Sequence, residues 1–278
     1  MRKLIVFAAL ALDASSSVAA SVSGGSSSSY VVVGQSNILD VGAAGIAVPT
    51  AEGRIANTNY VVGLRSGYIN LTDSVIAAPG ISSAYVVLTG RNLAETWKSS
   101  VGAGVDVYSY RPVSDSIGAF PLFGGEVIAK VSGVEVYFGE WAPRKAGMSP
   151  DHSTDLNLTS ANRTVFYAGE NPTNAMPTLV NAKYDVVGIR RFDPSAPSVS
   201  TGTLTANYGG GGGTLAGSIV GGAGTVNFTG TTIATNGSFK NATGIIKGQF
   251  YGSGAEVLAG MYHTGNPATS VAFGGKKQ

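Results

Sequence analysis

The chain has 278 residues, of which only 12% are charged, and its formal net charge at pH 7 is +2. This near-neutral balance excludes the strongly basic surface that attracts nucleic acids or anionic membranes. The absence of cysteine excludes a disulfide framework and the thiolates of most structural zinc and iron–sulfur sites, while forty glycines among frequent Val, Thr, Ser and Tyr favour many short strands.

The first twenty residues have the pattern of an export signal. Arg2 and Lys3 precede the apolar run "LIVFAALAL", and "SVAA" supplies small residues suited to cleavage after Ala20. Asp13 interrupts the apolar run, which is too short to span a bilayer. Without Arg2, Lys3 and Asp13, the 18 basic and 16 acidic residues become 16 and 15. Because no cysteine follows the signal, we expect a secreted protein without a bacterial lipid anchor.

The next two segments differ in pattern. Residues 21–29, "SVSGGSSSS", are predicted to be a flexible leader. Residues 30–155 mix strand-like runs with irregular loops and are predicted to form a β-rich domain. Its strand candidates are "YVVVG", "NYVVGLRSGYINL", "SAYVVLTG", "GVDVYSYRP", "GEVIAKV" and "GVEVYFGEW". A single short helix is predicted at "RNLAETWKSS", because Leu93 and Trp97 lie four residues apart on one helical face.

From residue 156 to residue 278 the pattern becomes regular. We expect eight strands, in the runs "RTVFYAGE", "AKYDVVGIRRF", "TLTANYGG", "GTLAGSIV", "GTVNFTGTTIAT", "GSFKNATGIIKGQF", "AEVLAGMYH" and "ATSVAFGGKK". Evenly spaced strands separated by Gly, Asn or Ser are typical of an up-and-down antiparallel barrel, whose closure removes exposed sheet edges. The predicted fold is therefore all-β, with an N-terminal β-rich domain followed by a C-terminal eight-stranded antiparallel β-barrel.

The stretch "GIIKGQFYGSGAEVLAGMYHTG" predicts a β-hairpin with glycines inside its strands, which fits the close backbone approach of a small barrel. Its motif and the terminal "VAFGGKKQ" resemble the barrel domain of transferrin-binding protein B and its soluble relatives. The matching positions are Gly248, Phe250, Tyr251, Gly252, Ala255, Gly260, Phe273, Gly275 and Lys276. The family glutamate usually lies a little later than Glu256, so Val257 is a small departure from that pattern.

The whole arrangement resembles the hemophilin-type secreted haemophores, which are cargo of the Slam outer-membrane translocons (type XI secretion). The resemblance implies that residues 30–155 form a ligand-binding handle domain whose loops hold haem. It also implies that the barrel carries secretion information, and that haem, taken in some cases from a host haem protein, is delivered to a TonB-dependent receptor. We expect a monomer that binds no nucleic acid.

Haem needs an apolar slot, polar groups for its propionates and an axial ligand. His152, in the polar loop "RKAGMSPDHSTDLN", is the predicted axial ligand, with Tyr137 and Met148 as secondary candidates. Lys145 or Arg144 could pair with a propionate. The alternatives are that His152 is an ordinary solvated loop residue and that Tyr137 only packs against a sheet. His263, the other histidine, is expected to be a strand-end residue of the barrel and not a haem ligand.

No coherent set of acid, base and nucleophile emerges, so an enzyme is not predicted. "DHSTD" holds the residue types of a hydrolytic triad, but residues so close in sequence seldom converge on one substrate atom. Two alternatives to a haem carrier stay open. One is a carrier or co-receptor of the same architecture for another small molecule, metal complex or host protein, and the other is an adhesin that uses the handle as a protein-binding surface.

Overall fold

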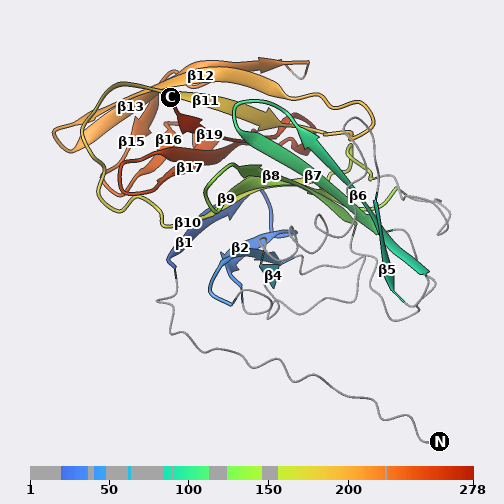
Figure 1. Cartoon of the computed structure of the whole chain (residues 1–278). Coiled ribbons are helices and arrows are strands. Elements are labelled where there is room, and N and C mark those ends of the chain that lie inside the picture. The colour runs from blue at the N-terminus through green and yellow to red at the C-terminus, as the bar shows by residue number, and fades with distance from the viewer. Residues whose placement is uncertain are drawn as a thin grey trace, which may run out of the picture.

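The computed structural model describes residues 20–36, 41–47, 62–63, 84–88, 91–112, 124–145, 156–222 and 224–278 (Figure 1). These residues form nineteen β-strands and one 3-10 helix, η1 (Pro267–Thr269), so the all-β prediction is confirmed. Nowhere in these ranges is there a helix long and apolar enough to cross a membrane.

A seven-stranded antiparallel sheet, here called the handle sheet, has the strand order β1-β10-β9-β8-β7-β6-β5. Its strands are β1 (Val22–Ser26), β5 (Ala84–Leu88), β6 (Arg91–Ser100), β7 (Val105–Pro112), β8 (Gly125–Val131), β9 (Val136–Ala142) and β10 (Thr164–Glu170). A second, three-stranded sheet consists of β2 (Val32–Gln35), β3 (Ala44–Ala47) and β4 (Val62–Gly63). This small sheet lies beneath the handle sheet in Figure 1.

The C-terminal strands close into the predicted barrel. They are β11 (Leu179–Ile189), β12 (Ser200–Gly209), β13 (Gly212–Gly221), β14 (Gly224–Asn227), β15 (Thr231–Ile233), β16 (Ser238–Asn241), β17 (Ile246–Tyr251), β18 (Val257–Tyr262) and β19 (Val271–Lys277). The order β12-β11-β19-β18-β17-β16-β15-β13 returns to β12 through an additional β12–β13 pairing, which gives eight strands in a closed ring. β14 also pairs with β13, beside β15.

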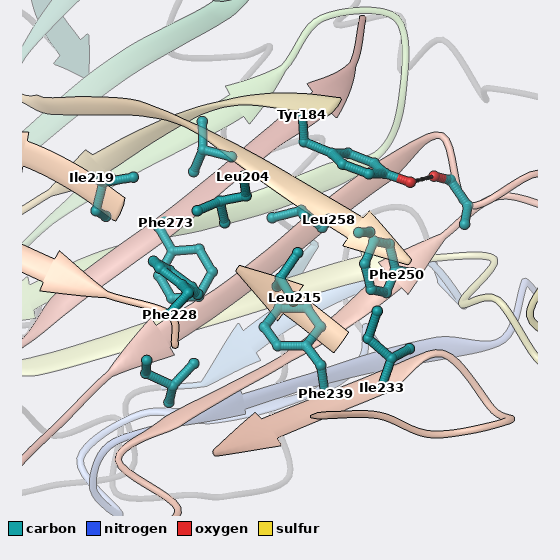
Figure 2. Close-up of a cluster of buried hydrophobic side chains, with 14 of the residues drawn as sticks. Tyr184, Leu204, Leu215, Ile219, Phe228, Ile233, Phe239, Phe250, Leu258 and Phe273 are labelled. Atoms are coloured by element: carbon teal, nitrogen blue, oxygen red, sulfur yellow. Dashed lines mark hydrogen bonds between the residues drawn. The ribbon is translucent and has the colours of Figure 1, made fainter. Parts of the chain in front are cut away.

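The barrel interior is filled by apolar side chains, among which the aromatic rings dominate (Figure 2). Phe228 packs edge-on against Phe273, with ring centroids 4.9 Å apart, and Phe239 packs in the same manner against Phe250 at 5.4 Å. The motif glycines make this packing possible, because a Cβ on Gly248 would collide with the ring of Phe239. An eight-stranded barrel can be filled by side chains or can hold one small ligand, and the described residues favour a filled interior.

The handle sheet lies between the barrel and the small sheet. Its inner face packs on the barrel, with Val107 and Phe138 in one apolar cluster with Val187 and Val257. Its outer face carries a second cluster that includes residues of β2 and β3 or next to them. The outer-face cluster consists of Val31, Ala44, Ile46, Ile128, Tyr137, Trp141, Phe166 and Ala168. Both faces of the sheet are consequently covered at its centre, and β9 is buried along its whole length.

Two predicted segments have different structures. Residues 21–29 contain β1, which pairs with β10, so the flexible-leader prediction is wrong for this part of the chain. Gly24 allows the pairing, because a Cβ there would collide with the carbonyl oxygen of Tyr167. The predicted helix at 91–100 is strand β6, which pairs with both β5 and β7. An isolated ten-residue helix is marginal in water, whereas pairing on both sides satisfies the strand backbone.

The run "RTVFYAGE" belongs to the handle sheet and is not the first strand of the barrel. It forms β10, which pairs with β9 on one side and with β1 on the other. The barrel ring begins at β11. β10, which precedes β11 in the chain, belongs to the handle sheet. The predicted division of the chain at residues 155 and 156 stays a prediction. The side chains of β10 are buried in the clusters on both faces of the handle sheet.

Candidate functional site on the handle sheet

The haem-site residues predicted from the sequence lie at or beyond β9. His152 and Met148 fall outside the described residues. Lys145 is exposed just after β9, where the backbone of Arg144 pairs with that of Leu156 in an isolated bridge. Tyr137 is fully buried in the outer-face cluster, and its hydroxyl donates a hydrogen bond to the Glu135 carboxylate.

A lysine accompanies Tyr137 on the outer face. Lys130 Nζ lies 3.0 Å from each carboxylate oxygen of Glu135 and 5.5 Å from the centroid of the Tyr137 ring. Lys130 and Tyr137 face each other across β8 and β9, which explains why the cation lies over the ring. The three side chains thus form one partly buried ionic and aromatic group.

A second lysine–tyrosine pair lies on the same face, on β6 and β7. Lys98 Nζ lies 3.3 Å from a carboxylate oxygen of Asp106 and 5.4 Å from the centroid of the Tyr108 ring. The hydrogen bond with Tyr108, and further the charges of Tyr108 and Asp106, raise the pKa of Lys98 although partial burial opposes them. Both lysines are therefore positioned as fixed cations beside aromatic rings.

One carboxyl group on this face is poorly solvated. Glu126 lies opposite Trp141 on β9, and burial raises its pKa from 4.5 to about 7. Trp141 itself is buried and stacks on Tyr30, with ring centroids 5.7 Å apart and an angle of 13° between the rings. Together, Tyr30, Glu126, Lys130, Tyr137 and Trp141 form the candidate site: aromatic rings, a cation and a carboxyl that changes charge near neutral pH.

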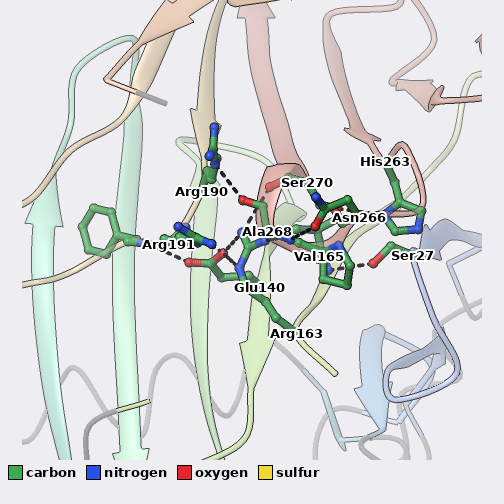
Figure 3. Close-up of polar contacts among 12 residues, drawn as sticks. Ser27, Glu140, Arg163, Val165, Arg190, Arg191, His263, Asn266, Ala268 and Ser270 are labelled. Atoms are coloured by element: carbon green, nitrogen blue, oxygen red, sulfur yellow. Dashed lines mark hydrogen bonds and ion pairs between the residues drawn. The ribbon is translucent and has the colours of Figure 1, made fainter. Parts of the chain in front are cut away.

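The inner face is fixed to the barrel by a buried ion pair (Figure 3). Arg163 Nε lies 2.7 Å from Glu140 Oε2, and both side chains are almost completely buried. Arg163 also donates to the carbonyl oxygens of Pro267 and Ser270, which lie in and after η1 on the barrel. The buried ion pair lies within the handle part of the chain, and the bonds from Arg163 to these two carbonyl oxygens join it to the barrel.

The barrel motif makes a second connection. Tyr251 donates its hydroxyl to the carbonyl oxygen of Ser23 on β1, at 2.9 Å, and its ring fills the space beside Gly169 on β10. Ala255 has a left-handed backbone, with φ of 52°, and its carbonyl oxygen accepts a hydrogen bond from Tyr184. The sequence motif that predicts the barrel hairpin thus also positions the handle sheet.

The remaining motif residues serve the hairpin itself. Phe250 is fully buried in the barrel core. Gly252 turns the chain with φ of 83°, and Gly260 leaves room for Phe273, since an added Cβ would lie 2.7 Å from that ring. His263 lies at the barrel end, where its Nδ1 is 2.7 Å from Ser270 Oγ, while burial and the charge of Lys247 lower its pKa.

The charged side chains described above are held in ion pairs or by hydrogen bonds. The charged groups of the outer face are bonded to one another, and Glu140 is bonded to Arg163 and to backbone amides. Within the described ranges no three histidine, aspartate or glutamate side chains are grouped so that they could hold a metal ion. Aromatic rings flanked by fixed cations are suited to a flat, anionic ligand or to a protein surface.

Sequence reasoning missed Glu126, Glu140 and Arg163. Glu140 and Glu126 occur within apolar runs, "YFGEW" and "GEVIAKV", and a carboxylate inside such a run signals either a partner or a shifted pKa. That signal was present in the sequence. Arg163 gave none, because its partner lies 23 residues away on another strand.

Comparisons with known proteins find solved structures that resemble this chain at low sequence identity. No protein-family model matches the chain. A mutant of the vaccine antigen transferrin binding protein B from Actinobacillus pleuropneumoniae H49 is 14% identical, with a TM-score of 0.34 over 54% of this chain and 78% of that one. A surface lipoprotein is 15% identical, with a TM-score of 0.32 over the same shares.

Isotype 1 transferrin binding protein B from serogroup B Neisseria meningitidis is 14% identical. Its TM-score is 0.31, over 84% of this chain and 40% of that one. At these scores no functional argument follows, and the architecture of this chain rests on its own strand pairing.

Proposed function

We propose that the protein is an exported, non-catalytic carrier that captures haem on its handle domain and delivers it to a TonB-dependent outer-membrane receptor. Export through a Slam-type translocon belongs to the same proposal. The supporting observation is the contrast between the two domains. The barrel interior is filled by side chains, whereas the outer face of the handle sheet carries Lys98 and Lys130, each beside a tyrosine ring.

The outer face offers two of the elements that haem recognition requires. Aromatic rings such as Tyr108 provide apolar surface, and Lys98 and Lys130 provide cations that two propionates could reach by displacing Asp106 and Glu135. Glu126, whose pKa is about 7, adds a group whose charge would influence an anionic ligand near neutral pH. Tyr137 supports this surface as a buried residue bonded to Glu135.

The axial ligand remains the one proposed from the sequence, His152. The bridge between Arg144 and Leu156 closes the ends of the segment that contains it, beside the end of β9 that carries Trp141. Four peptide units separate His152 from Leu156, so their Cα atoms can be at most about 14 Å apart. That reach is compatible with a ligand placed at the Trp141 end of the outer face.

The experiment is a haemin titration of the purified protein, followed by absorbance. We expect a saturable one-to-one shift of the Soret band, lost in His152→Ala and retained in His263→Ala, which controls for removing a histidine. Full affinity in His152→Ala would remove the axial assignment. A spectrum identical to free haemin would overturn the haem proposal, and native mass spectrometry for another bound molecule or a host-protein partner would then test the two alternatives.

A further inference from the structure

The carboxylate of Glu140 already accepts four hydrogen bonds, three of them on Oε2. Its Oε2 accepts from Arg163 Nε and, at 3.0 Å, from the backbone N–H of Arg191. Its Oε1 accepts from the backbone N–H of Phe192 at 2.7 Å. Arg163 also donates through Nη2 to Oε2. These four donors come from Arg163 and two backbone amides, and none comes from the side chain of Arg191.

The Arg191 side chain is left without that carboxylate. Its Nε–H is buried and has no hydrogen-bond acceptor, although the residue as a whole is only partly buried. The Arg191 backbone is left-handed, with φ of 50°, a conformation that non-glycine residues adopt only when their surroundings impose it. The bond from its N–H to Glu140 supplies that constraint. The structure thus holds the Arg191 guanidinium with its Nε–H unpaired.

The surroundings of Arg191 are cationic. Arg190 donates from Nε to the carbonyl oxygen of Ala268 at 3.0 Å (Figure 3). Burial lowers the pKa of Arg190, the charges of Arg191 and Arg163 lower it further, and Glu140 opposes this with a smaller effect. The guanidinium groups of Arg163, Arg190 and Arg191 are therefore close enough to influence one another electrostatically, and positive charges grouped in this way favour an anion.

We propose that the corner formed by Arg190 and Arg191, between the end of β11 and η1, is a binding site for an oxyanion. A carboxylate or phosphate group would accept from Arg191 Nε and one of its terminal nitrogens in the paired geometry that guanidinium favours. Because this Nε–H is buried while the residue is only partly buried, the proposal requires the Arg191 side chain to rotate toward the ligand. The inference does not depend on the proposed carrier function, and a free anion or a carboxylate of a larger ligand such as haem could supply the group.

The test uses the complete protein and inorganic phosphate as the probe. Phosphate is titrated at constant ionic strength against chloride, and binding is followed by calorimetry and by the NMR signal of the arginine Nε–H groups. We expect saturable binding that shifts one Nε–H signal and weakens about tenfold or more in Arg191→Gln. Lys240→Gln, which removes an exposed charge from β16, is the matched control and should bind phosphate normally.

Three results separate this site from the carrier function. Phosphate binding that is lost in Arg191→Gln supports the site even if haemin does not bind. Haemin binding that weakens in Arg191→Gln and competes with phosphate also supports it and identifies a ligand carboxylate as the source. Phosphate that shows no saturation, or equal binding in Arg191→Gln and the unaltered protein, overturns the site, even when haemin binds through His152.

Discussion

The barrel buries its apolar face inside itself, whereas the handle sheet buries both faces against other parts of the chain. In the barrel strand β12, buried and more exposed residues alternate, as expected for a sheet with one solvated side. In the handle strand β9, all seven residues are buried. The handle sheet therefore depends on contacts that come from distant segments, including a buried ion pair, while the barrel depends mainly on its own hairpins.

The largest expected effect comes from removing the buried ion pair that lies where the handle sheet packs on the barrel. In Arg163→Leu, the Glu140 carboxylate would stay buried without its counter-ion, which costs about 3–5 kcal/mol. We expect this loss in urea unfolding followed by circular dichroism. Lys98→Met, which breaks a more exposed pair with Asp106, should cost less than about 1 kcal/mol. Equal effects in the two variants would contradict the buried role of Arg163.

A smaller effect on the handle sheet should depend on pH. Because the pKa of Glu126 is higher in the folded protein (about 7) than its ordinary value of 4.5, the folded state binds a proton more tightly between these values. Its contribution to stability is therefore complete below pH 4.5, is lost as pH rises to 7 and is constant above, for a total of up to about 3 kcal/mol.

Glu126→Gln tests this assignment, because it removes the titration while keeping the shape of the side chain. We expect the variant to gain stability relative to the unaltered protein as pH rises from 5 to 8, measured from unfolding midpoints at each pH. The environment of the nearby Trp141 also provides a fluorescence signal for the handle sheet. A stability difference that stays constant over this range would show that Glu126 titrates normally.

The smallest of the three effects concerns the barrel core. Gly248→Ala places a methyl group against the ring of Phe239, and overpacking of this kind costs about 1–3 kcal/mol. Gly34→Ala in β2 is the matched control, since an added Cβ there meets nothing within 4 Å, and we expect a change of no more than about 0.5 kcal/mol. A Gly248→Ala variant as stable as Gly34→Ala would mean that the barrel core can rearrange.

The prediction of the barrel succeeded because its signals are local. Strand and turn residues alternate along the chain, and the motif glycines, such as Gly248 and Gly260, occur within the hairpin that they shape. The prediction failed for β1 and β6, where pairing with distant strands overrides local composition. The serines and glycines of β1 have no strand pattern, and they pair because β10 offers an edge that their small side chains fit.

The candidate site also contains one residue that the sequence predicted and others that only strand pairing reveals. Tyr137 was chosen from the sequence as an aromatic residue on a handle strand, and the structure places it there, buried against Glu135. Its neighbours Lys130 and Trp141 could not be assigned to the same face without the register of β8 and β9. The predicted roles of Lys145, Met148 and His152 in haem binding stay predictions.

The sequence by itself determined the β class, the closed barrel and the glycine-containing hairpin, because alternation and turn residues act between neighbours in the chain. Only the tertiary structure decided which charges meet. Glu140 comes from β9, Arg163 from the segment before β10, and Arg191 from the residues after β11. Charges from three separate segments are brought together only when the handle sheet packs on the barrel. In that arrangement the Nε–H of Arg191 has no hydrogen-bond acceptor.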